Sequence, residues 1–286
     1  MASQNEIRKR IKAVESTSKI TNAMKLVASA KLKKQKDMFN NQTEYYKKFY
    51  DLFSYIKINA EIDTFFKKKN EDGKTIWLCF FSTMGLCGSF NINLVKELKK
   101  HVSKQDQIWL IGKKGKPIMK SKNILNEITL DVELEDKDIN YDLCYLLADN
   151  LLKTFNDNYD IKSVKMIYSN FVNSLSFVPK VFSLLPLDKI ISESRLEKPK
   201  NGSEYHIKPS ADELFKSVLN DYLATCIYGA IIESKLCENA SRRNAMEAST
   251  KNANELIKNY KLELNRKRQS DITQEITEII SGTGGD

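Results

Sequence analysis

Both ends of this chain are long stretches without helix-breaking residues. No glycine precedes Gly73, no proline precedes Pro117, and Pro209 is the last proline of the 286 residues. The whole chain holds 10 Gly and 5 Pro, where average usage gives about 20 and about 14. A chain with so few turn residues favours long helices and argues against an all-β sandwich or a propeller.

The first stretch carries a helix start signal and an apolar periodicity. Ser3–Glu6 reads as a capping box, in which Ser3 and Glu6 each bind a free backbone N–H. Ile7, Ile11 and Val14 then recur at spacings of four and three. After a shift, the pattern is expected to continue through Ile20, Met24 and Val27. We predict one helix over residues 3–57, about 80 Å long.

The last stretch mirrors the first. Ser210–Glu213 is a second capping box, and apolar residues at heptad spacing follow from Met246. Gly282 is a natural stop. We predict a helix from Ser210 to this stop, about 105 Å long, with a tolerable glycine at position 229.

The part between the helices has a different hydrophobic pattern. Short, nearly all-apolar runs at 75–82 and 107–111 are typical of buried parallel strands, and 164–168 and 177–185 are further strand candidates. Residues 91–101 and 142–155 have helical patterns. We therefore expect an α/β fold with long helices: an antiparallel coiled coil of the N- and C-terminal helices plus a small Rossmann-like α/β domain. The expected domains are 1–57, 58–209 with its flanking linkers, and 210–286.

The apolar stripes of the two helices explain why they should pair. A helix of about 100 Å cannot cover its stripe on a domain about 30 Å across, so each helix should cover the other. Residues 1–57 carry a net charge of +8 and residues 210–286 a net charge of −2, which favours the pairing. Because the second helix is longer, we expect an unpaired end near 264–281 that a partner protein covers; a frayed tail and self-association are the alternatives. Its apolar side chains are Ile272, Ile276, Ile279 and Ile280.

The sequence gives little support for chemistry in this chain. It has two histidines and no CxxC pair among five cysteines, so we expect no catalytic, cofactor-binding or metal-binding residues. The cysteines should be packed thiols in a reducing compartment. Residues 112–117 lack the spacing of a phosphate-binding loop, and Gly85 and Gly88 favour a tight turn over a phosphate cradle.

Location and general binding class follow from charge and hydropathy. The N-terminus lacks a signal-peptide pattern, and the longest apolar run is about ten residues where a bilayer span needs about 20. We expect a soluble, cytoplasmic protein that reaches a membrane only through partners. The net charge of +9 leaves a nucleic-acid-binding coiled coil as an alternative, and the α/β domain leaves a stand-alone enzyme as another.

Several segments together resemble one family, the gamma subunit of F-type ATP synthase, the central shaft of that rotary motor. They cover about a third of the chain, stand in the family's order and include the family's central signature at Gly85–Asn91. The other matching segments are Ile7–Val14, Ser18–Leu32, Glu238–Ile257 and Asn265–Gly282.

The resemblance implies a non-catalytic part of a complex for ATP synthesis, hydrogen ion transport or ATP hydrolysis. The shaft would turn inside three alpha and three beta subunits, with the epsilon subunit and a membrane c-ring as further partners and no nucleic acid. ATP, ADP and Mg would be bound by partner subunits and none by this chain. The complex would lie at the cytoplasmic side of the cell membrane, with this chain as a peripheral component of its central stalk.

The resemblance also implies roles for particular residues. The isoleucine end named above would be the bearing tip, and Tyr205 and Lys208 would face the c-ring. The contacts with the beta subunits would be made by Met24, Lys25, Arg242, Arg268, Gln269, Thr273 and Glu275.

Two positions depart from the family pattern. Thr83-Met84 stands where the family usually has Asp-Arg before its central signature, and Lys208 stands where it often has an acidic residue. A reversed charge at a docking surface weakens the fit to an unchanged partner. A rotor of an F-type-like ATPase that drives something other than a standard proton channel is therefore the alternative.

Overall fold

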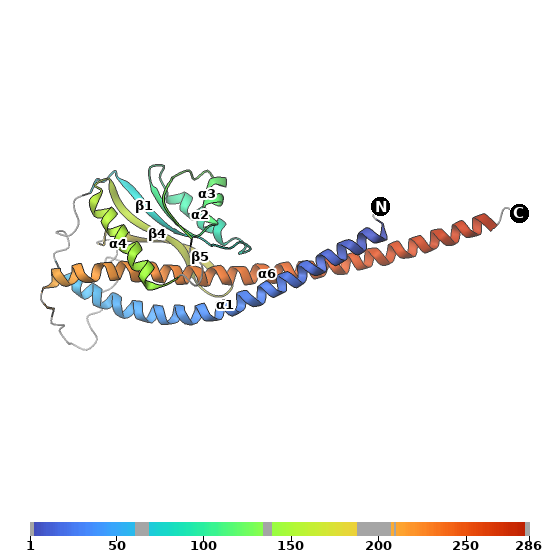
Figure 1. The fold of residues 1–286 in the computed structure, drawn as a ribbon, viewed down its shortest axis with the longest axis horizontal. Helices are drawn as coiled ribbons and strands as arrows, with labels where there is room; N and C mark the ends of the chain where they lie inside the picture. Colours follow the sequence, from blue (N-terminus) through green and yellow to red (C-terminus); the bar gives the residue numbers. More distant parts are fainter. Residues whose placement is uncertain (1–2, 61–68, 134–138, 188–206, 209, 284–286) are drawn as a thin grey trace. The chain divides into compact units, whose positions relative to one another are not determined.

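The computed structural model describes residues 3–60, 69–133, 139–187, 207–208 and 210–283 (Figure 1). Within these ranges the contacts group the chain into two compact units, which are described separately. One unit pairs the two ends of the chain, residues 1–30 and 242–286, and the other comprises residues 31–241. The predicted domain bounds followed the ends of the helices, whereas this division falls inside them.

The elements alternate as expected between two long helices. In chain order they are α1 (Gln4–Asn59), β1 (Lys74–Phe80), α2 (Phe90–His101), β2 (Gln107–Ile111), α3 (Gly115–Ser121), β3 (Glu127–Val132), α4 (Tyr141–Asp157), β4 (Ile161–Phe171), β5 (Phe177–Leu185) and α6 (Ala211–Thr283). None of the helices in the described ranges is long and apolar enough to cross a bilayer.

The start of α1 shows why the first helix forms where it does. The Ser3 N–H donates to Glu6 Oε2 at 2.9 Å, and the Glu6 N–H donates to Ser3 Oγ at 3.2 Å, which is the predicted reciprocal box. At the start of α6 the Glu213 N–H donates to Ser210 Oγ at 3.2 Å. Both helix starts were therefore correctly predicted from four residues each.

The unit of residues 31–241 is built on a five-stranded sheet of order β3-β2-β1-β4-β5. The first four strands are parallel and β5 is antiparallel to β4. Ile76, Leu78 and Phe80 of β1 pack on a face covered by α1, α4 and α6. Trp77 and Cys79 pack on the opposite face with α2 and α3. Because β1 is covered on both faces, its near-continuous apolar run is that of a central parallel strand.

The sequence analysis did not predict two elements of this unit, the helix α3 and the strand β3. The helix α3 has seven residues, which is too short for a periodic pattern, and it holds Pro117 in its first turn, where proline is tolerated. The strand β3 lies at the sheet edge and alternates exposed and half-buried residues, so Ile128, Leu130 and Val132 give only a weak signal.

The structure corrects the predicted phase of α1. Ile20 and Val27 are 61% and 58% exposed, so the apolar pattern does not continue through them. The inner positions keep the original spacing of three and four, which brings Ser18 and Thr21 inside and leads to the buried Ala28. The helix keeps one continuous phase because it pairs with one partner helix along this stretch.

Candidate functional site

The unit made of the two chain ends is an antiparallel helix pair with polar contacts between its helices. Along the pair, the residue numbers increase on α1 while those of the contacting residues on α6 decrease, so the two helices are antiparallel. Thr21 Oγ1 lies 2.7 Å from Thr250 Oγ1, and Ser18 Oγ donates to Asn254 Oδ1 at 2.9 Å. The outer contacts are Glu15 with Lys261 at 3.7 Å and Gln4 Nε2 with Asp271 Oδ2 at 2.9 Å.

The last contact corrects the length of the unpaired end. The prediction placed its start near residue 264, but α1 still contacts Asp271. The two helices are displaced by several residues relative to the register in which both leave the domain together. The helix pair therefore reaches at least to Asp271, and the exposed isoleucines of α6 begin with Ile272.

This end of α6 leaves large apolar side chains in solvent. Ile272 is 44% exposed, Ile276 51%, and both Ile279 and Ile280 are 66% exposed. Burying such a side chain fully is worth about 1.5–3 kcal/mol, so a partner surface would gain free energy by covering the end. The four isoleucines predicted to form a bearing tip are thus exposed among the described residues.

In the unit of residues 31–241, α6 crosses the carboxyl edge of the sheet. Ser234 Oγ donates to the Phe80 carbonyl at the end of β1 at 3.5 Å. Ser241 Oγ donates to the Cys87 carbonyl, in the loop after β1, at 2.6 Å. These two serines stand two helical turns apart, so they present the same face of α6 to the same edge.

The same helix also bonds to the end of β4. Glu233 Oε1 accepts from Asn170 Nδ2 at 2.6 Å and from the Phe171 N–H at 2.8 Å, and Cys237 Sγ donates to the Ser169 carbonyl at 3.3 Å. β1 and β4 are neighbours at the place where the strand order reverses, which is where open α/β sheets bind their ligands. Here α6 occupies that position. We call these bonds the switch-point contacts.

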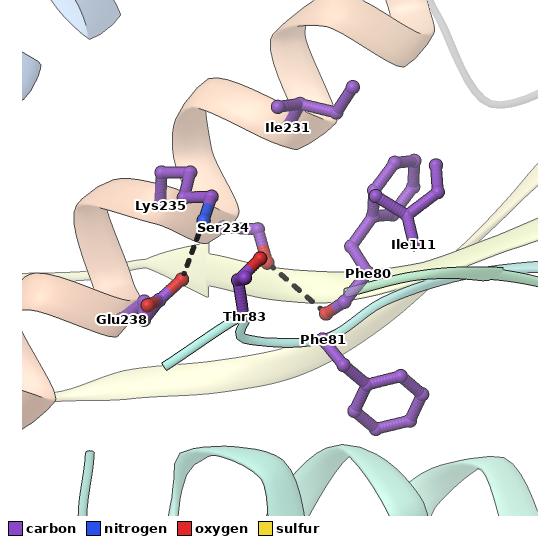
Figure 2. Close-up of a pocket in the computed structure, with 8 residues that line it drawn as sticks. All are labelled: Phe80, Phe81, Thr83, Ile111, Ile231, Ser234, Lys235 and Glu238. Carbon is purple, nitrogen blue, oxygen red and sulfur yellow. Dashed lines mark hydrogen bonds and ion pairs between the residues drawn. The ribbon is translucent and has the colours of Figure 1, made fainter. Parts of the chain in front are cut away.

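Little space is left beside the switch-point contacts. The cavity there has a volume of about 10 Å³ and is lined in part by Phe81, Thr83 and Ile111 (Figure 2). Such a volume holds about one water molecule, so no nucleotide fits. Lys235 Nζ lies 3.2 Å from Glu238 Oε2 at the cavity wall, where both side chains are more than 90% buried. The Rossmann-like crevice of this domain therefore holds its own helix.

The loop of the family signature is structural. Gly88 has φ of +56°, a conformation that favours glycine, which confirms the predicted tight turn. Asn91 closes the loop, because its Oδ1 accepts from the Ser82 N–H at 3.0 Å and its Nδ2 donates to Ser82 Oγ at 2.7 Å.

The cysteines are packed thiols, as predicted. All five are buried and none forms a disulfide. Burial raises the pKa of Cys144 and that of Cys226 to about 12, so these thiols stay protonated and unreactive at neutral pH. No cluster of three His, Cys, Asp or Glu in the described ranges could hold a metal ion.

The residues expected to contact beta subunits differ in accessibility. Met24 and Lys25 are half-buried, and Arg242 is only 7% exposed, so it is the least open to a partner. Lys208 is exposed, and Tyr205 lies outside the described residues. The four remaining contact residues lie exposed on α6: Arg268, Gln269, Thr273 and Glu275.

Sequence reasoning missed the switch-point contacts entirely. The signal that could have found them is the polar run at 233–235 inside an otherwise apolar stretch of α6. Polar side chains at helical positions that are buried on all sides need hydrogen-bond partners from another element.

Comparisons with known proteins agree with this architecture. The family model for ATP synthase matches residues 3–284. The ATP synthase gamma chain of Malacoplasma penetrans is 68% identical over 286 residues, covering 100% of both chains. The chain belongs to the ATP synthase gamma chain family. As in the family, it forms the central rotor shaft of a rotary, membrane-associated ATP synthase.

More distant relatives share the full length and the fold. The ATP synthase gamma chain of Ureaplasma parvum serovar 3 is 39% identical over 284 residues, covering 98% of this chain and 99% of the relative. The central stalk and c-ring structure of the Tetrahymena thermophila mitochondrial ATP synthase contains a chain that is 25% identical, with a TM-score of 0.59 over 80% of this chain and 98% of that one. A chain of the Euglena gracilis mitochondrial ATP synthase in its OSCP/F1/c-ring structure shares the fold at 16% identity, with a TM-score of 0.69 over 98% of this chain and 93% of that one.

Proposed function

We propose that this rotor shaft turns inside a ring of three alpha and three beta subunits, so that its rotation forces the nucleotide sites of the ring through their states. ATP, ADP and Mg would be bound by the ring, and none by this chain. The observation that carries the proposal is the end of α6 from Ile272 on, whose isoleucines are 44–66% exposed. The shaft can shift the conformations of the ring subunits only if it makes different contacts with each conformation.

Exposed polar residues before and among the isoleucines at the end of α6 support contacts with beta subunits. Four such residues are exposed: Arg268, Gln269, Thr273 and Glu275. Thr273 Oγ1 donates a hydrogen bond to the Gln269 carbonyl at 2.9 Å. Met24, Lys25 and Arg242 would form a second contact region. In that region Met24 and Lys25 offer more accessible surface than Arg242.

We propose that the α/β domain contacts the epsilon subunit and a c-ring, on the cytoplasmic side of the membrane. The support comes from the relatives, since the Tetrahymena chain belongs to a central stalk with a c-ring. Lys208, one of the two residues expected to face the c-ring, is exposed. Coupling to a proton-conducting c-ring is the proposal, and a rotor that drives a different load is its alternative.

The tip can be tested by substitution within the assembled complex. The variant Ile276→Gln/Ile279→Gln keeps the helix but removes apolar surface, so we expect slower ATP-driven rotation and lower torque in single-molecule assays. The matched control Gln274→Ala/Glu278→Ala alters two exposed residues that bond to each other on the same helix and should rotate normally. Unchanged rotation in the isoleucine variant would count against the bearing role.

The membrane partner is best identified by co-purification. A c-ring recovered with the complex supports the proposed load, and ATP-driven proton uptake by vesicles that contain the complex tests it directly. Recovery of the alpha and beta subunits without a c-ring would favour the alternative rotor.

A further inference from the structure

A second and larger cavity lies within the unit of residues 31–241. It has a volume of about 280 Å³, opens to solvent and is lined by α1, by β4 and β5, and by α6. Its apolar wall includes Phe39, Met166 and Phe182. Both the volume and the mixture of aromatic and polar walls are those of a small-molecule site.

One helix position at the wall of the cavity has no side chain. Gly229 lines it from α6, and a Cβ atom placed on this glycine would meet no atom within 4 Å. Close packing therefore does not require glycine here. Nor does the backbone, since α6 is helical at this position and a glycine inside a helix is less favourable than an alanine. What glycine provides at position 229 is open space.

One buried polar atom at the cavity, Gln42 Nε2, has no hydrogen-bond partner in the described part of the chain. Native structures rarely leave a buried donor unsatisfied, so it indicates a missing acceptor. The carboxylate of Glu233 also lines the cavity. Its Oε1 accepts from Asn170 and from the Phe171 N–H, and no bond to its Oε2 is present among the described residues.

The charge around the cavity is balanced. Glu233 is 9% exposed, and the positive charge of Lys180, an exposed residue that also lines the cavity, acts on its carboxylate. A ligand with a net charge would be attracted by one of these residues and repelled by the other. A neutral ligand meets no such conflict.

We propose that this cavity binds a small, neutral, largely aromatic molecule that carries hydroxyl or amide groups. Its aromatic body would lie against Phe39, Met166 and Phe182, over Gly229. Its polar groups would donate to Glu233 Oε2 and accept from Gln42 Nε2. The site is separate from the isoleucine end and from the switch-point cavity, and binding to it does not depend on the rotor role.

The first test uses 4-phenylphenol as the probe and biphenyl as its matched control without a donor. Each is added to the full chain with ¹³C-labelled methionine and alanine methyl groups. We expect saturable shifts of the Met166 and Ala230 signals, both from cavity residues. Met119, which packs on the other face of the sheet, should not respond. No saturable shift of Met166 or Ala230 at about 1 mM 4-phenylphenol overturns the proposal.

The second test fills or re-polarises the cavity. Gly229→Leu should weaken 4-phenylphenol binding by at least about tenfold, whereas Gly229→Ala, the matched control, should bind within about twofold of the original. Glu233→Gln keeps an oxygen for the Phe171 N–H but turns the free acceptor into a donor. It should weaken 4-phenylphenol by about tenfold and leave biphenyl unchanged.

The outcomes separate the parts of the proposal. Equal binding to Gly229→Leu and to the original chain would place the probe elsewhere and overturn the site. Equal affinities for biphenyl and 4-phenylphenol would overturn the polar recognition. If Gly229→Leu fails to fold, the Glu233→Gln comparison decides, because that variant changes one atom type and no volume.

Discussion

At the scale of single residues, Ser241 joins α6 to the loop after β1 with a short switch-point contact, 2.6 Å to the Cys87 carbonyl. We expect Ser241→Ala to lower the free energy of unfolding by about 1 kcal/mol, because the buried carbonyl loses a donor. Urea unfolding of the full chain measures this. The control is Ser217→Ala, whose exposed hydroxyl bonds only within its own helix, to the Leu214 carbonyl. Equal losses in both variants would contradict a special role for Ser241.

A second residue-scale prediction concerns pH. Burial raises the pKa of Glu233, against the opposing effects of its hydrogen bonds and of Lys180. A carboxyl with a raised native pKa binds its proton more tightly in the folded state. Its contribution to stability is thus present below the ordinary carboxyl pKa of about 4.3 and lost as pH rises through the raised value. The free energy of unfolding, compared with that of Glu233→Gln by urea titrations from about pH 4 to 7, should therefore fall with pH. Parallel curves would contradict this.

At the scale of elements, the polar interior of the helix pair sets its alignment. Thr21 and Thr250 share a 2.7 Å contact where a coiled coil usually has apolar residues. We expect each single Thr→Val change to destabilise the chain by about 0.5–1 kcal/mol, and the double change to cost less than their sum.

This double-mutant cycle is measured by urea unfolding of the full chain. A suitable control cycle combines Thr43→Val with Thr277→Val, because these hydroxyls bond within separate helices, to the Phe39 and Thr273 carbonyls. The control cycle should be additive. Additivity in both cycles would show that the Thr21–Thr250 contact does not couple the helices.

At the scale of the whole molecule, the free chain and the assembled enzyme should respond differently to the same change. Ile7 is 2% exposed and Ile279 is 66% exposed, although both lie in the unit of the chain ends. We expect Ile7→Ala to cost about 2–4 kcal/mol of unfolding free energy in the free chain, and Ile279→Ala less than about 0.5 kcal/mol.

Only assembly with the ring should make Ile279 important, because its side chain is 66% exposed in the free chain and gains free energy when it is buried. Thermal unfolding of the free chain and of the complex, compared for both variants, measures this. An equally large loss for Ile279→Ala in the free chain would show that the end of α6 is already covered by the chain itself.

By itself, the sequence determined the features that depend on neighbouring residues. Capping boxes at Ser3 and Ser210 act over three positions, and the apolar runs at 107–111 and 177–185 became β2 and β5 with those bounds. These signals are local, so they can be read without knowing what packs against them. The similarity of the two ends to the gamma family was equally local, since it rests on contiguous segments.

The tertiary structure decided what depends on a distant partner. It placed Thr21 inside and Ile20 outside, because the inner face of α1 is fixed by α6 and not by hydropathy alone. It extended the helix pair at least to Asp271, because the register of two helices is set by their contacts along the whole pair. It brought Glu233 to the end of β4, since a buried polar residue shows its role only when its hydrogen-bond donor, far away in the chain, is in place.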